Sequence, residues 1–375
     1  MAELVGMTWD HARGFEPMVA TSEAYEKAHP GVSIRWEKRS LQAFADRPIE
    51  EMADRYDLMV IDHPHVGEVA GTGLLIAFDD AGRDADLKRL AAQSVGLSHT
   101  SYNFGGKQWA LAIDAATPVA AFRPDLIAEA PRDWDGVMDL ARRGKVAFAL
   151  IPINALMTFM GLVRNLGADV AGGSSFVDRA AGEEVLGRLG EVMGLMDPRC
   201  LTLDPIGIYE WMGRSAEAPA YSPFGYGYTN YSRRGYCRFP LHFTDAPGLR
   251  GDDPSGTVLG GTGIAVSAAS TEREIATDYA LWIAGADCQK GLFFEAGGQP
   301  GNAVAWEDEA CNAATHDFFR ATRRTLDTAW LRPRYDGYMG FQDRGGAIVH
   351  AFLRGDTPAR ATLDALQAAH EESRA

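Results

Sequence analysis

The chain has 375 residues, and its 51 acidic and 36 basic residues give a net charge of -15 at pH 7. A nucleic-acid backbone is neutralised by clustered Lys and Arg, so this charge balance argues against a nucleic-acid partner. No run of about 18 apolar residues is present, and we expect no membrane-embedded segment. The length predicts two domains, and the 46% of hydrophobic residues can fill their cores.

The first half of the chain predicts a doubly wound α/β unit. A strand over 4–9 is followed by a helix over 15–29, a strand over 32–36, a helix over 48–56 and a continuous apolar strand over 58–61. A helix over 84–99 precedes a strand pattern, Gly106 to Arg123, that is interrupted by Asp114. This stretch lacks the composition of a flexible linker and is interpreted as a hinge.

The second half predicts another α/β unit. We expect a strand over 146–151 and helices over 131–143, 155–166 and 182–196. The apolar, glycine-containing stretch 258–266 predicts a second crossing between the units. Further helices are predicted over 271–284, 317–328, 347–353 and 358–372.

Residues 221–236 hold five tyrosines among glycines and a proline. Tyrosine combines flat apolar area with a hydroxyl group, so this stretch predicts either a ligand-contact surface or a loop that packs on its own lobe.

Acidic and imidazole side chains gather where strands are predicted to end: Asp10 with His11, then Asp62, His63 and His65, then Asp114. The carboxyl ends of strands in open α/β sheets are where ligands bind. An Asp and His pair could act as acid and base if the two side chains meet in a cleft. His63 and His65 alternate, but Pro64 between them favours an irregular turn, and no metal site is predicted.

The four cysteines are Cys200, Cys237, Cys288 and Cys311, without a CxxC or a paired metal-ligand spacing. They predict neither a zinc site nor a small disulfide framework, and their disulfide state stays open. Cys237, near Arg238 and His242, is the candidate for a nucleophile, although a buried structural cysteine is the preferred interpretation. Glycines at 259–263 lack the order of a phosphate loop, and we expect no cofactor.

Several segments together carry a family resemblance. AYEKAHPGVSIRWEKR at 24–39, YDLMVIDHPHVGEVAGTGLLIAFDD at 56–80 and GKQWALAIDAATPVAAFRPDLI at 106–127 resemble extracellular solute-binding proteins of ABC transporters. PRDWDGVMDLA at 131–141 and residues 258–302 are similar to later segments of the same family. The family is that of the maltose- and sugar-binding kind, with the type 2 periplasmic-binding-protein fold.

The resemblance implies an α/β fold with two lobes, each a sheet flanked by helices, joined by hinge crossings near 110–116 and 258–264. Lobe I is expected to comprise 1–113 plus 262–312, and lobe II 114–261 plus 313–375. The implied ligand-binding residues come from both lobes: Trp9, Asp10, His11, Arg39, Asp62, His63, Asp114, Tyr226, Tyr228, Gly260 and Gly261.

By this resemblance the protein binds a small polar ligand, a carbohydrate or a carboxylated metabolite, in a cleft between lobes that closes by hinge motion. The ABC transporter membrane subunits are the implied partners, and we expect a monomer. The resemblance implies a periplasmic or extracellular location, whereas Met1 to Asp10 show no signal-peptide pattern, which favours the cytoplasm. The alternative is a cytoplasmic enzyme on the same scaffold that uses Asp10, His11, Asp62 and His63 as acids and bases.

Overall fold

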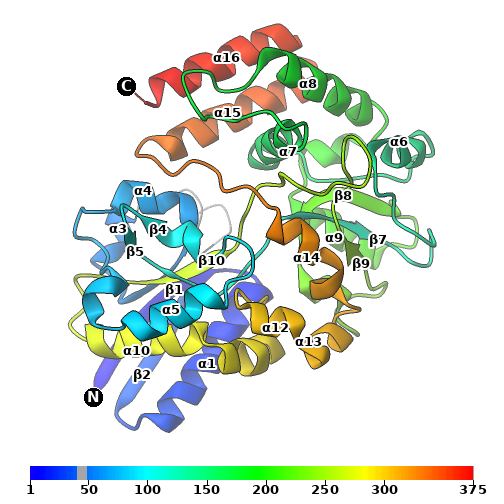
Figure 1. The fold of residues 1–375 in the computed structure, drawn as a ribbon. Coiled ribbons are helices and arrows are strands. Elements are labelled where there is room, and N and C mark those ends of the chain that lie inside the picture. The colour runs from blue at the N-terminus through cyan, green and yellow to red at the C-terminus, as the bar shows by residue number, and fades with distance from the viewer. Residues whose placement is uncertain (40–48, 375) are drawn as a thin grey trace. The chain divides into compact units, whose positions relative to one another are not determined.

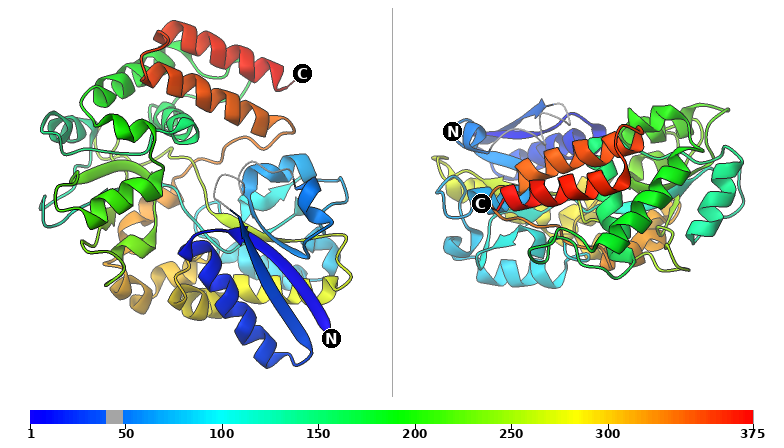
Figure 2. Two further views of the ribbon diagram at one scale, coloured as in Figure 1. Left: turned by 180° about the vertical axis from the view of Figure 1, so that it is seen from behind. Right: turned by 90° about the horizontal axis from the view of Figure 1, so that it is seen from above.

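The computed structural model describes residues 1–39 and 49–374. The chain folds into two compact units: unit 1 comprises Met1–Ala116 and Gly260–Asn312, and unit 2 comprises Thr117–Leu259 and Ala313–Ala375 (Figures 1 and 2). Both contain a sheet and helices, so the predicted α/β class is confirmed. The chain passes between the units at three points. One of these points, between Ala116 and Thr117, lies at the end of the predicted segment 110–116, and another, between Leu259 and Gly260, lies within the predicted segment 258–264. The role of both segments as hinges stays a prediction.

Unit 1 is built on a five-stranded sheet with the strand order β2-β1-β3-β10-β6. Strand β1 is parallel to β2 and β3, and β10 runs antiparallel between β3 and β6. This topology brings the carboxyl ends of β1, β2, β3 and β6 and the start of β10 to one edge of the sheet. The strands of this unit, including the β4-β5 hairpin, are β1 (Ala2–Trp9), β2 (Val32–Arg39), β3 (Leu58–Asp62), β4 (Asn103–Phe104), β5 (Lys107–Gln108), β6 (Leu111–Ala112) and β10 (Thr262–Val266).

Helices α1 and α10 pack against this sheet and against each other. Tyr25 of α1 meets Tyr279 of α10 edge to face, with the ring centroids 5.2 Å apart, and the Tyr279 hydroxyl lies 2.9 Å from Thr21 Oγ1. In β2, Trp36 lies over Gly6, where a Cβ atom would come within 2.5 Å of the indole ring. Its Nε1 donates to Ser22 of α1 at 2.7 Å. Large aromatic groups therefore hold sheet and helices together.

The helices of unit 1 follow the predicted apolar spacing but differ in length. The helix predicted over 84–99 ends at Ala92, and the one predicted over 48–56 is a short turn of helix over Glu50–Ala53, with Pro48 outside the described residues. The helices are α1 (Ala12–Ala28), α3 (Glu50–Ala53), α4 (Val66–Val69), α5 (Asp84–Ala92), α10 (Arg273–Ala284), α11 (Ala286–Cys288), α12 (Ala303–Glu307) and α13 (Glu309–Ala314), the last of which reaches into unit 2.

Unit 2 combines a small antiparallel sheet, ordered β8-β7-β9, with a group of packed helices. Its strands are β7 (Pro118–Phe122), β8 (Tyr221–Tyr226) and β9 (His242–Thr244). Its helices are α6 (Trp134–Arg142), α7 (Pro152–Asn165), α8 (Arg179–Met193), α9 (Pro205–Arg214), α14 (Phe318–Asp327), α15 (Tyr338–Leu353) and α16 (Ala359–Glu372).

Helices α7, α8, α15 and α16 form one layer of unit 2 (Figure 2). Two glycines of α15 allow close approach to α7: a Cβ atom on Gly346 would lie 2.9 Å from the Pro152 backbone, and Gly345 faces Leu156. The sequence indicated only the last part of α15, because these glycines weaken the helical pattern over 338–346.

The strand predicted over 146–151 is wrong in its pairing. Residues 146–150 are buried as expected, but only Val146 forms a bridge, to Tyr221, and the Leu150 N–H donates to Cys200 O at 2.8 Å. The Ala147 N–H donates to Tyr221 O at the start of β8 at 3.0 Å, and the bond of Leu150 is to a connecting segment, so the stretch meets a neighbouring strand only at its beginning. The sequence therefore predicted the burial of the apolar residues 146–150 but not their backbone hydrogen-bond partners.

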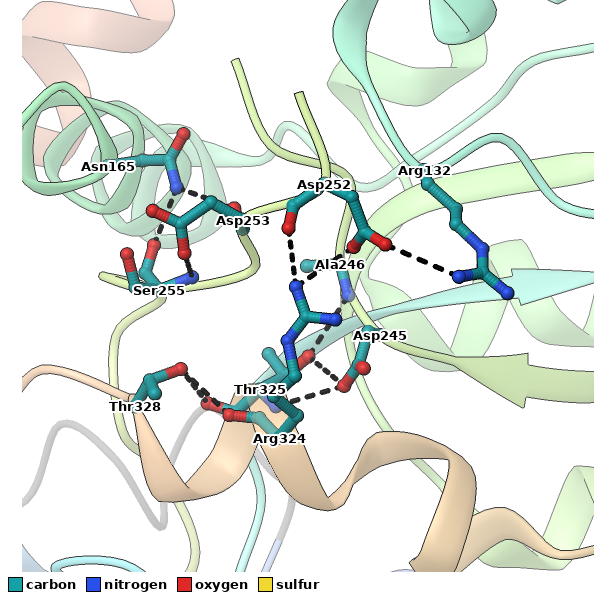
Figure 3. A network of polar contacts seen from close by, with 10 residues as sticks. All are labelled: Arg132, Asn165, Asp245, Ala246, Asp252, Asp253, Ser255, Arg324, Thr325 and Thr328. Atoms are coloured by element: carbon teal, nitrogen blue, oxygen red, sulfur yellow. Dashed lines mark hydrogen bonds and ion pairs between the residues drawn. The ribbon is translucent and has the colours of Figure 1, made fainter. Parts of the chain in front are cut away.

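Polar contacts fix the segment 245–255, which leads from β9 toward residue 259 (Figure 3). Asp245 accepts from both the N–H and the hydroxyl of Thr325 at 2.9 and 2.7 Å, and that hydroxyl accepts from the Ala246 N–H at 3.1 Å. Asp252 pairs with Arg324 of α14 at 2.9 Å and Arg132 at 3.3 Å. This irregular segment is thereby anchored within unit 2.

Asn165 at the end of α7 supports the same segment from another side (Figure 3). Its amide nitrogen donates to the carbonyls of Asp253 and Ser255 at 2.8 and 2.9 Å, and its oxygen accepts from the Leu249 N–H at 2.8 Å. One amide thus satisfies three backbone groups that have no strand partner.

We expect Gly261→Ala to destabilise unit 1 by about 3 kcal/mol or more, because it combines backbone strain with a steric clash. Gly261 has φ +96°, and its Cβ would lie 2.4 Å from Asp114 O. Gly31→Ala is the matched control, because Gly31 has φ +101° with open space around it, so about 1–2 kcal/mol is expected there. The shift of the urea midpoint measures both. Equal shifts would contradict the close approach.

Candidate ligand-binding residues of each unit

The carboxyl edge of the unit 1 sheet collects most of the residues predicted to bind a ligand. Strands β1, β2 and β3 end there at Trp9, Arg39 and Asp62, because they run parallel. Asp114 reaches the same edge after β6, where its N–H and O bond to Thr262 at 3.1 Å, and Thr262 is opposite Asp62. The topology therefore brings together residues more than one hundred positions apart.

Asp114 is committed to an ion pair inside unit 1. Its two carboxylate oxygens accept from Nε and Nη2 of Arg13 at 2.7 and 2.5 Å, and both side chains are buried. Burial raises the pKa of Asp114, and the adjacent guanidinium of Arg13 opposes that shift. The pair is bidentate, a geometry that fixes both groups. The sequence analysis did not predict the pairing of Asp114 with Arg13, because the residues next to Arg13 in sequence give no sign that it contacts Asp114.

Asp10 and His11 follow β1 in the turn that begins α1. Asp10 is exposed and pairs with Lys38 of β2 at 2.7 Å. His11 is the N-cap of α1, and its Nδ1 accepts from the Arg13 N–H at 3.0 Å. A side-chain acceptor at this position satisfies a helix N–H that has no intrahelical partner. His11 thus has a structural task at this edge.

Asp62 and His63 lie beside Tyr102. Asp62 is partly exposed at the end of β3, whereas His63 is fully buried and meets the Tyr102 ring edge to face at 6.2 Å. The Tyr102 hydroxyl is within hydrogen-bond distance of Ile61 O and Gly261 O, at 3.2 and 3.3 Å. Tyr102 therefore ties the end of β3 to the start of β10, a role that its sequence context did not indicate.

Trp9 and Arg39 line this edge through their ring and guanidinium groups. The Trp9 indole packs on Gly14, where a Cβ would lie 2.3 Å from the ring. The Arg39 guanidinium lies 5.4 Å from the centre of the Tyr56 ring, a cation–π distance. The N–H of Gly260 donates to Ala116 O at 2.7 Å.

In unit 2 the tyrosine-rich stretch divides into core and candidate ligand surface. Tyr221 and Tyr231 are fully buried; Tyr221 donates to Pro131 O at 3.2 Å and Tyr231 to Glu210 at 2.9 Å. Burial raises the pKa of both phenols. These two tyrosines belong to the core, as the alternative interpretation expected.

Tyr226 and Tyr228 occupy the end of β8 and the turn after it. Tyr226 is partly exposed, and its carbonyl accepts from the Tyr209 hydroxyl at 3.1 Å. Tyr228 is largely buried, with its ring centroid 6.4 Å from that of Tyr209. Tyr209 of α9 holds both, and a Cβ on Gly225 would come within 2.4 Å of its hydroxyl.

Sequence reasoning missed a buried polar group around α15. Arg332 donates to Gln342 Oε1 at 2.6 Å, and both are buried. Burial raises the pKa of the Tyr338 hydroxyl, the charge of Arg332 opposes that shift and Tyr226 reinforces it. The available signal was the density of Arg, Tyr and Trp in residues 330–338, outside any predicted helix.

The four cysteines are free and buried. Burial raises the pKa of the Cys237 thiol, and its sulfur lies 3.2 Å from Phe239 O. A thiol with a raised pKa is a poor nucleophile, which supports the structural interpretation of Cys237. In residues 1–39 and 49–374, no group of three or more His, Cys, Asp or Glu could hold a metal ion, and no helix is long and apolar enough to cross a membrane.

No protein-family model matches this sequence, and no curated protein matches it. Solved structures match its whole length. The maltose-bound protein MalE3 of T. maritima has a TM-score of 0.83 at 15% identity, with 99% of this chain and 100% of that chain covered.

Two further similar structures are ABC transporter solute-binding proteins. One, from Agrobacterium radiobacter K84 in complex with ribitol, has a TM-score of 0.80 at 18% identity, covering 99% of this chain and 98% of that one. The other, from Agrobacterium vitis S4 with bound D-mannitol, has a TM-score of 0.81 at 15% identity, covering 100% and 98%. The predicted resemblance is confirmed at the level of the fold.

Asp114→Asn should destabilise unit 1 by about 3–5 kcal/mol, because it leaves the buried Arg13 without its carboxylate. Asp10→Asn is the control: its exposed pair with Lys38 should contribute less than about 1 kcal/mol. Urea denaturation of both variants measures the difference. The double variant Arg13→Met with Asp114→Leu should recover much of the loss, because neither buried charge remains. Similar stabilities of the Asp114 and Asp10 variants would contradict the buried pair.

Proposed function

We propose that this protein, which has the fold of the solute-binding proteins of ABC transporters, binds a neutral carbohydrate or polyol and serves transport. One observation carries the proposal: the chain matches, over 98–100% of both lengths, structures that hold maltose, ribitol and D-mannitol. A match that includes both units supports a common scaffold rather than one shared domain. Fold alone does not determine function, so the side chains must support it as well.

The charges of the unit 1 edge favour a neutral ligand over a carboxylated one. Asp114 is neutralised by Arg13, and Asp10 by Lys38. Two carboxylates and two cations at this edge thus cancel locally. A polyhydroxylated ligand needs acceptors and donors in fixed positions rather than a net charge, and carboxylate oxygens such as those of Asp62 are strong acceptors for hydroxyl groups.

Residues of unit 2 would supply aromatic surface. Tyr226 is partly exposed at the end of β8 and is held through its backbone by Tyr209. A phenol ring offers apolar area for the C–H face of a sugar and a hydroxyl for its oxygens. We assign ligand contacts to Asp62 and Trp9 of unit 1 and to Tyr226 and Tyr228 of unit 2, with the remaining predicted residues, including the fully buried His63, in supporting positions.

The proposed partners are the membrane subunits of an ABC transporter, and the proposed oligomeric state is a monomer. Light scattering should then give a mass near 40.6 kDa with and without ligand. Loss of the gene should abolish uptake of the sugar or polyol that the purified protein binds, whereas unchanged uptake would count against transport.

A thermal-shift screen of maltose, ribitol, D-mannitol and D-tagatose against gluconate, citrate and amines tests the ligand class. A neutral sugar or polyol at 100 times its dissociation constant should stabilise the protein by about 2.7 kcal/mol, because it binds only the folded state. The organic acids and amines should not stabilise it. Stabilisation by an acid alone would replace the neutral ligand with a carboxylated metabolite.

Asp62→Asn and Tyr226→Phe test the assigned contacts by calorimetry with the ligand so found. We expect roughly tenfold weaker binding for Asp62→Asn and a smaller loss for Tyr226→Phe, since hydrogen bonds to charged groups contribute more than neutral ones. Asp57→Asn is the control in unit 1, because Asp57 precedes β3 at the opposite edge and bonds to the Val5 N–H and Ser270. Tyr221→Phe is the control in unit 2. Both controls should lose stability and keep affinity; the reverse pattern would refute the assignment.

A further inference from the structure

Tyr209 of α9 packs against the tyrosine-rich stretch of unit 2 and is fully buried. Its hydroxyl donates to the Tyr226 carbonyl at 3.1 Å, and its ring centroid lies 6.4 Å from that of Tyr228. The two tyrosines to which we assign ligand contacts in unit 2 therefore share one buried neighbour. Because its own side chain is buried, any effect of Tyr209 on a ligand must pass through these neighbours.

The peptide group that follows Tyr226 is held at both ends. Its carbonyl accepts from the Tyr209 hydroxyl, and its N–H, that of Gly227, donates to the Thr117 carbonyl at 3.3 Å. Gly227 is also tightly packed, since a Cβ atom there would lie 2.8 Å from the Phe318 ring. Rotation of this peptide group would break both hydrogen bonds. The backbone between the two assigned tyrosines is thus fixed by contacts within unit 2.

Gly225 makes room for the Tyr209 hydroxyl. A Cβ atom on Gly225 would lie 2.4 Å from that hydroxyl oxygen, so a side chain at this position would push the phenol away from the β8 backbone. The carbonyl that the hydroxyl reaches, that of Tyr226, is the last one of β8. A partly buried carbonyl that loses its donor is destabilised, so without the hydroxyl the Tyr226 carbonyl would turn toward another donor or toward water.

Helix α9 is attached to the same stretch at a second point. Glu210 accepts from the buried Tyr231 hydroxyl at 2.9 Å and also pairs with Arg214 one turn later in the helix. The Tyr231 and Tyr209 ring centroids lie 5.4 Å apart. Two successive residues of α9 therefore hold the stretch through phenol hydroxyl groups. One of these hydrogen bonds reaches an assigned ligand residue, whereas the other lies in the core and offers a matched comparison.

We propose that Tyr209 is a positioning residue for the ligand and acts through Tyr226. This inference rests on the proposed function and deepens it: the affinity for a neutral carbohydrate or polyol depends on a hydroxyl group that does not touch the ligand. A ring that contacts a sugar contributes most when the free protein already holds it in the bound orientation, because ordering a residue on binding costs free energy. The hydrogen bond of Tyr209 orders the Tyr226 backbone during folding, before the ligand arrives.

Calorimetry with maltose, ribitol and D-mannitol compares Tyr209→Phe with the matched control Tyr231→Phe. Each variant removes one buried hydroxyl group that connects α9 to the stretch, and each keeps its ring. Tyr209→Phe should weaken binding by about threefold to tenfold, the equivalent of one neutral hydrogen bond. Tyr231→Phe should lose stability and keep its affinity within about twofold, because its hydrogen bond lies in the core. Unchanged affinity in Tyr209→Phe, or equal losses in both variants, would overturn the inference.

Tyr226→Ala separates positioning from a general loss of stability. In that background Tyr209→Phe should weaken binding by less than about twofold further, because the ring that it positions is gone. A fully additive loss would contradict the route through Tyr226.

Amide hydrogen exchange tests the same contact without ligand. The Gly227 N–H should exchange roughly tenfold faster in Tyr209→Phe than in Tyr231→Phe, because its peptide group has lost one of its two anchors. Unchanged exchange would overturn the positioning role alone. If none of the three compounds binds the unaltered protein, by contrast, the proposed function falls with them.

Discussion

The ion pair between Arg13 and Asp114 connects the beginning of α1 to the point where the chain leaves β6. Removing two charges from water is costly, and the cost is offset only when the hydrogen bonds are well formed, as in this bidentate contact. The pair fixes the start of α1, and with it the turn that carries Asp10 and His11. It also fixes Asp114, whose backbone pairs with Thr262. The edge where a ligand is proposed to bind thus depends on one buried contact.

The antiparallel strand β10 has a similar organising effect. It lies between β3 and β6, so the chain must return to unit 1 after residues 117–259, which belong to unit 2. That return requires a glycine at 261, because the backbone approaches Asp114 too closely for a side chain. Tyr102 closes the same region by contacting the carbonyls of Ile61 and Gly261.

The tyrosine-rich stretch 221–236 of unit 2 serves two structural purposes. Five tyrosines in sixteen residues indicated a ligand surface or a packed loop, and the stretch contains both. Tyr221 and Tyr231 are fully buried, whereas Tyr226 is partly exposed. Tyr226 differs because it is the last residue of β8, whose first five residues are all buried, and Tyr209, which contacts both Tyr226 and Tyr231, lies on a helix that the sequence pattern did not predict. The sequence analysis did not predict the buried polar group around Arg332 and Tyr338, because its members come together only through the packing of α15.

The sequence alone determined the α/β class, most helices and strands, and the order of segments that resembles solute-binding proteins. These features depend on local periodicity and on turn residues, which are properties of neighbouring positions. Asp62 and Asp114 could also be placed at strand ends, because a strand end is a local event. The tertiary structure alone decided the pairing of Asp114 with Arg13, the burial of His63, the stacking of His242 on His316 and the single bridge that segment 146–151 makes, to Tyr221. Each of these depends on residues far apart in the chain, and local patterns carry no information about which distant segment will lie opposite.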